Sequence, residues 1–151
     1  MTIVLGLLRQ LAASHDGEPW YGRSRRALLR GVSAADAAAT PIAGAPSIWG
    51  TVLHLTAWTR EVTRRLQGSA PGEPAEGDWP PVPAPTDRAW RQARAALGAA
   101  HADLLRVAQG LSARELELPV GNGVTRGEML VGVAQHDAYH AGQIALLKKA
   151  L

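Results

Sequence analysis

Residues 47–66 read SIWGTVLHLTAWTREVTRRL, and this stretch decides the fold class. Its apolar side chains recur at the spacing of an α-helix and form one face, made of Ile48, Val52, Leu55, Val62 and Leu66. Ser47 can cap the first turn with its hydroxyl, and Gly68 follows the last turn. The stretch therefore predicts a long amphipathic helix.

The same helical spacing continues on both sides of this stretch, and consecutive β-branched residues are scarce. Thr86 is a candidate cap for a helix over 87–111, and Thr125 has capping-box spacing with Glu128 at the start of a helix over 125–150. Further helical segments are predicted over 2–14, 22–30 and, as a short turn, 33–39. We predict an all-α protein, a four-helix up-down bundle with an extra short helical segment after the first helix.

The chain has 151 residues, which fits a single domain over 1–151. It has no cysteine, so disulfides and thiolate ligands are excluded, and a reducing, cytoplasmic location is expected. No apolar run is long enough to span a bilayer, and residues 1–8 lack the basic start of a signal peptide. We therefore expect no membrane partner.

The formal net charge is only +3, and the arginines are scattered except for a cluster at Arg23, Arg25, Arg26 and Arg30. Nucleic-acid interfaces carry denser basic stripes with base-reading elements among them. We interpret this cluster as a solvated basic face, and a nucleic-acid partner is not expected.

Residues 68–85 contain six prolines and three glycines, which predicts a loop of unusual length for a compact domain. Such a loop requires an unusual connection within the bundle. Trp79 is a large apolar side chain inside it. The side chain either pins the loop to the bundle or forms part of a pocket lid, and we favour the pin.

Two histidines in the last predicted helix have the spacing of a metal site. They lie in the stretch HDAYHAGQ, residues 136–143, and His136 and His140 are four residues apart, so they project from one face. We predict that they lie in an inward stripe with Met129, Val133, Ile144 and Leu147. A shared metal ion satisfies two such imidazoles, whereas the alternative is two core histidines bonded to backbone or tyrosine groups.

His54, on the helix over 47–66, is the candidate third ligand, since metal sites with an open position commonly have three protein ligands. The other two histidines are expected to do something else. His15 lies at a helix end and is predicted to be exposed, and His101 is predicted to be half-buried packing.

Four neighbours of these histidines are candidate pocket or supporting residues. Gln143 follows His140 by one turn, so it either orients a bound water or substrate or joins two helices. Asp137 is interpreted first as a surface charge, with an acceptor for a ligand histidine as the alternative. Trp58 and Tyr139 are expected to line a cavity beside the metal site.

The segments SIWGTVLHLTAW, residues 47–58, and HDAYHAGQI, residues 136–144, together resemble the DinB-like superfamily, which includes YfiT-type metal-dependent hydrolases. The resemblance covers nearly the whole chain and implies a four-helix bundle with a metal site formed by His54, His136 and His140. It further implies zinc, nickel or manganese as the metal, and often a homodimer. Some relatives are thiol-S-transferases that use bacillithiol or mycothiol.

We therefore predict a divalent-metal-binding protein that transfers a thiol, with a small-molecule substrate and a low-molecular-weight thiol as cosubstrate. The chain lacks cysteine, so the thiol has to arrive from outside. Hydrolysis of the YfiT type is the alternative, weakened because the histidine motif carries no glutamate to act as a general base. A non-catalytic metal-binding or interaction module is the third interpretation.

Overall fold

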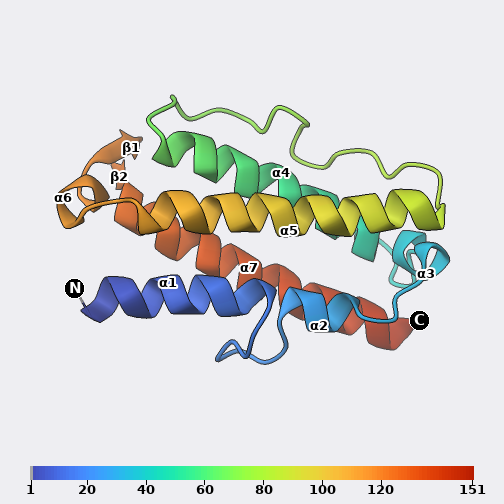
Figure 1. The fold of residues 1–151 in the computed structure, drawn as a ribbon. Helices are drawn as coiled ribbons and strands as arrows, with labels where there is room; N and C mark the ends of the chain where they lie inside the picture. Colours follow the sequence, from blue (N-terminus) through green and yellow to red (C-terminus); the bar gives the residue numbers. More distant parts are fainter. Residues whose placement is uncertain (1) are drawn as a thin grey trace.

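The computed structural model describes residues 2–151 and is mostly helical, as the periodicity predicts (Figure 1). Met1, the first residue of the predicted domain, lies outside the described residues. The helices are α1 (Thr2–His15), α2 (Arg25–Leu29), α3 (Ala34–Ala38), α4 (Ile48–Leu66), α5 (Asp87–Gln109), α6 (Ala113–Leu116) and α7 (Arg126–Ala150). Two short strands, β1 (Pro119–Gly121) and β2 (Val124–Thr125), pair in an antiparallel hairpin. Within residues 2–151, no helix combines the length and apolarity that crossing a membrane requires.

The long helices begin at the predicted caps. The hydroxyl of Ser47 accepts a hydrogen bond from the backbone N–H of Gly50 at the start of α4. Thr86 caps α5 in the same way. Thr125 and Glu128 form a capping box at the start of α7. These side chains satisfy backbone donors that have no partner inside the helix, which is why the boundaries could be predicted from local sequence.

Two small elements were not predicted. The helix expected to continue to residue 111 ends at Gln109, and α6 follows as a separate turn with its own capping box at Ser112. The connection expected over 119–124 forms the β1–β2 hairpin. Its turn contains Asn122 at φ 52° and Gly123 at φ 75°, and positive φ at both positions is what the tightest hairpin turns require.

The helices α4 and α5 run in the same direction, so they do not alternate as in a simple up-down bundle (Figure 1). Trp49 and Trp90, near the two helix starts, pack with ring centroids 5.0 Å apart. The loop over 67–86 carries the chain back along the length of α4. Nineteen helical residues span about 28 Å at 1.5 Å each, and an extended loop of this length covers that distance easily.

A polar layer separates two apolar clusters in the core. One cluster holds the first half of α4 and the last turns of α7, with Trp49, Trp90 and Ile144 among its members. The other holds Leu11 and Leu66 with the first half of α7. Buried polar side chains lie at the level between them, contributed by five helices: Ser14, Arg25, His54, Thr56, Thr59, His101, Asp137 and His140. This layer contains the candidate site.

Candidate metal centre

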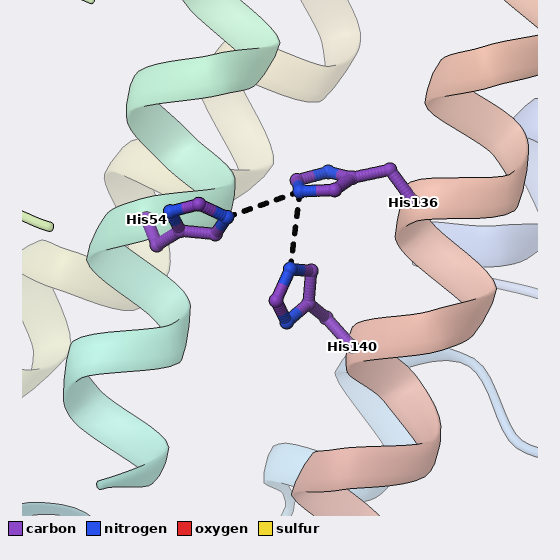
Figure 2. Close-up of side chains that lie close together, drawn as sticks. All are labelled: His54, His136 and His140. Carbon is purple, nitrogen blue, oxygen red and sulfur yellow. Dashed lines mark hydrogen bonds between the residues drawn. The ribbon is translucent and has the colours of Figure 1, made fainter. Parts of the chain in front are cut away.

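Three imidazole rings converge from α4 and α7 in the polar layer (Figure 2). The Nε2 atom of His136 lies 3.0 Å from Nε2 of His54 and 3.0 Å from Nε2 of His140. A tetrahedral zinc ion with bonds of 2.0–2.1 Å separates its nitrogen ligands by about 3.3 Å, so a small shift of the rings accommodates an ion. The residues proposed from the sequence as ligands are therefore brought together.

Hydrogen bonds at the far side of two rings determine which nitrogen carries the proton. The Nδ1–H of His54 donates to the backbone carbonyl of Asp78 at 2.7 Å, and the Nδ1–H of His140 donates to Oε1 of Gln143 at 2.6 Å. Because both oxygens only accept, Nε2 of each ring presents a lone pair toward the centre. Metal-ligating histidines are usually oriented by such bonds.

The three Nε2 atoms are better arranged to coordinate a cation than to hydrogen-bond to one another. Nε2 of His136 faces two lone pairs and carries at most one hydrogen, so at most one of its two short contacts is an ordinary hydrogen bond. A divalent ion satisfies all three lone pairs together. The set has no carboxylate or thiolate, which suits borderline metals such as zinc or nickel.

Both histidines of α7 are neutral at pH 7, as metal ligands must be. Burial lowers the pKa of His136 to about 4, and the nearby His140 and His54 rings add to this effect. Burial also lowers the pKa of His140, although its bond to Gln143 acts in the opposite direction. Few protons therefore compete with a metal at neutral pH.

The long loop forms one wall of the site. The Trp79 ring stacks on His54, with centroids 4.0 Å apart and planes 12° apart. The Asp78 carboxylate accepts a hydrogen bond of 2.7 Å from Nε1 of Trp58 and lies 3.3 Å from Nδ1 of His54. Farther along, the Gly72 N–H donates to the buried Glu61 carboxylate. These contacts attach the loop to α4, the role that we favoured for Trp79.

A pocket of about 370 Å³ opens beside His54 and His136. Its other lining residues come from α4, α7 and the loop: Trp58, Val62, Asp78, Gly132 and Val133. Trp58, expected at a cavity, is one of them. Tyr139, also expected there, is 65% exposed on the outer side of α7, and only its edge approaches the His140 ring. The histidine cluster is thus open toward a concave, largely apolar surface.

A family model of the DinB superfamily matches residues 23–144, which include all three histidines. The chain belongs to the DinB superfamily. Comparisons with curated proteins and with solved structures found no match to it. The family is thus known, while the reaction has to be inferred from the site of this DinB-superfamily protein.

Asp137 is buried, which corrects its interpretation as a surface charge. It is 1% exposed, and its Oδ1 accepts a hydrogen bond of 2.5 Å from Nη1 of Arg25, which is fully buried. The Ser14 hydroxyl lies 2.9 Å from the other oxygen. The buried residues of α7 are Leu130, Val133, Asp137, His140, Ala141, Ile144 and Leu147. His140 is therefore buried as predicted, whereas Asp137 takes the central place that we assigned to His136. His136 lies on the flank of this buried face, toward α4.

The remaining histidines also lie deeper than expected. His101 is 2% exposed rather than half-buried, and its Nδ1 accepts a hydrogen bond of 2.7 Å from Nη2 of Arg25. His15, predicted to be exposed, is partly buried and stacks on His101 at 5.0 Å. The prediction that Arg25 belongs to a solvated basic face is therefore wrong, whereas Arg23, Arg26 and Arg30 are exposed as expected. This buried network lies on the side of α7 away from the three clustered histidines.

Sequence reasoning missed three residues that support the site. Asp78 lies in the irregular loop, where no periodicity indicates which side chain meets α4. Arg25 appeared to be one of several surface arginines, and Ser14 carried no signal at all. The only usable hint was the Asp-Trp pair at 78–79, a charged and a large apolar residue within a proline-rich stretch.

We expect the metal-free protein to lose stability as the pH falls from 6.5 toward 3. Burial and the Arg25 charge lower the pKa of His101 to about 3. Between this value and the ordinary pKa of about 6.5, His101 is protonated in the unfolded chain and neutral in the folded chain, so a falling pH favours unfolding. The loss amounts to about 2 kcal/mol at pH 5 from His101. Urea unfolding at pH 7.5 and pH 5 measures it. His101→Gln retains an acceptor for Arg25 and should reduce this dependence by about that amount, while His15 and His136, whose pKa values are lowered to about 4, maintain the rest. An unchanged slope in that variant would contradict the assignment.

Proposed function

We propose that this protein is a divalent-metal-dependent transferase that activates the thiol of a low-molecular-weight cosubstrate of the bacillithiol or mycothiol type. The observation that carries the proposal is the convergence of three imidazole nitrogens at the edge of an apolar pocket. A bound zinc, nickel or manganese ion would supply the positive charge that lowers the pKa of a coordinated thiol.

The protein's own residues hold and shield this position. Asp78 and Gln143 orient two of the rings, so their lone pairs are directed before a metal arrives. Trp79 covers one face of His54 and restricts water on that side. Since the chain has no cysteine, the reacting thiol must come from a second molecule, and the open pocket leaves room for its acceptor.

Hydrolysis of the YfiT type is the second candidate, and Asp78 favours it. This carboxylate lines the pocket beside His54 and supplies the general base that the histidine motif lacks. One of its oxygens, however, already accepts from Trp58. A non-catalytic metal-binding module is the third candidate, but a purely structural site usually closes its coordination with a fourth protein ligand. Within the described residues, the histidine cluster has only three members.

The first test is metal content of the untagged full chain after incubation with zinc, nickel or manganese, compared with His54→Ala. We expect about one ion per wild-type chain and loss of most of it in the variant. His15→Ala is the matched control, because His15 is a partly buried histidine outside the cluster, and it should retain the metal. A wild-type chain without metal would contradict the proposal.

The second test separates the two reactions. Metal-loaded protein is assayed for conjugation of a cysteinyl thiol to chlorodinitrobenzene, in which the thiolate displaces chloride, and for hydrolysis of an activated ester without thiol. Metal-dependent conjugation that is lost in His54→Ala supports thiol transfer. Metal-dependent ester hydrolysis alone would replace it with the hydrolase.

We also propose a homodimer in a reducing, cytoplasmic compartment. Tyr139 and Leu146 lie two turns apart on the outer side of α7 and are 65% and 63% exposed. The absence of cysteine fits a reducing compartment. Sedimentation of wild type and Leu146→Glu at micromolar concentration tests the dimer, and a wild-type monomer would contradict it.

A further inference from the structure

We propose that the pocket beside the three histidines holds an uncharged, apolar part of the substrate, and that Gly132 sets the size of the group it accepts. The inference rests on the proposed function for its reaction, but it concerns the part of the substrate that does not react.

The lining of the pocket selects against charge. Away from the histidines, its walls are Trp58, Val62, Val133 and the backbone of Gly132. Asp78 is the one charged residue among the described lining residues, and its Oδ1 accepts a hydrogen bond from Nε1 of Trp58. A volume of about 370 Å³ is at the small end of ligand sites, so a compact ligand of one or two ring systems fits better than a polymer.

Gly132 lines this pocket without contributing a side chain. It lies one turn before His136 on the same face of α7. A Cβ atom built at Gly132 meets nothing within 4 Å. Side chains of helical residues lean toward the helix N-terminus, so a leucine at this position would extend away from His136 and toward the Val62 end. It would fill the pocket without touching the histidines.

The same helix offers a matched control. Gly142 is also an interior residue of α7, and a Cβ atom there also meets nothing within 4 Å. Gly142 does not line the pocket beside the histidines. Neither glycine has a positive φ, so leucine strains the backbone at neither position.

The test uses the full chain incubated with zinc and titrated with N-phenylnaphthylamine, a neutral fluorophore of two ring systems. We expect the wild type and Gly142→Leu to bind it with similar Kd, and Gly132→Leu to bind at least tenfold more weakly. The zinc content of all three should be equal. Equal fluorophore binding in Gly132→Leu, or equal loss in Gly142→Leu, overturns the inference.

Charge selection is tested on chelator-treated protein with anilinonaphthalene sulfonate, which adds an anionic group to a similar frame. We expect the chelator-treated protein to bind anilinonaphthalene sulfonate more weakly than it binds N-phenylnaphthylamine. Tighter binding of the sulfonate overturns the assignment of an uncharged ligand. The two proposals fail separately. A wild-type chain without zinc whose fluorophore binding still depends on Gly132 would contradict the metal-dependent reaction and support the pocket.

Discussion

Arg25→Met should lower the free energy of unfolding by about 3–5 kcal/mol, because it leaves the Asp137 carboxylate buried without its cation. Arg25 and Asp137 are 0% and 1% exposed, so water cannot replace the lost partner. Burial raises the pKa of Asp137 and the Arg25 charge opposes that rise, so the carboxyl of the variant should take up a proton more easily. A loss of this size is a large part of the 5–15 kcal/mol that stabilises a typical domain.

The neighbouring residue provides the control. Arg26 pairs with Asp16 at the surface, where the two side chains are 67% and 56% exposed, so Arg26→Met should change stability by less than about 1 kcal/mol. The double variant Arg25→Met with Asp137→Leu should recover much of the loss, because it removes both buried charges. Urea unfolding of metal-free protein measures all three. Equal stability of Arg25→Met and Arg26→Met would show that the buried pair is not what stabilises this layer.

The buried pair explains how α7 presents its histidines. Asp137 points toward Arg25, while His136 and His140 lie together on one flank of it, toward His54 of α4. A rotation of α7 that moved the histidines away from His54 would also pull Asp137 from the guanidinium. Polar layers of this kind distinguish one helix arrangement from its alternatives, whereas apolar contacts tolerate small shifts.

The helices could be predicted because their determinants are local. Ser47, Thr86 and Thr125 cap the next residues along the chain, and the apolar spacing of residues 48–66 matches the face that is buried. The β1–β2 hairpin was missed although Asn122-Gly123 carries its turn signal, because strands of two or three residues leave no periodic pattern.

The orientation of α7 could not be settled by periodicity. Polar residues at 136, 137 and 140 allow two inward faces that differ by a small rotation, and we predicted the one with His136 and His140 in its middle. The structure selects the face centred on Asp137, because Arg25, 112 residues away, supplies the charge that Asp137 needs. The three histidines that the structure brings together could be named nevertheless, since imidazoles at positions i and i+4 have the spacing of a metal-binding pair before any packing is known, and His54 was the candidate third ligand.

His140→Ala should abolish stoichiometric metal uptake while the protein stays folded. The variant removes one of three converging nitrogens, and the remaining pair, His54 and His136, provides only two ligands. We expect metal affinity to fall by more than about 100-fold, because losing even a hydrogen-bond partner of a ligand costs 10–100-fold. Elemental analysis and competition with a chromogenic chelator measure the loss, and circular dichroism reports whether the helices remain.

Gln143→Ala tests a smaller change at the same ring. It leaves His140 in place but removes the acceptor of its Nδ1–H, so Nε2 remains a ligand whose orientation is free. We expect a 10–100-fold weaker affinity, intermediate between wild type and His140→Ala. Full metal occupancy in His140→Ala would remove this histidine from the site. Equal losses in both variants would mean that ring orientation, rather than the number of nitrogens, limits binding, because both variants then lack a correctly directed third lone pair.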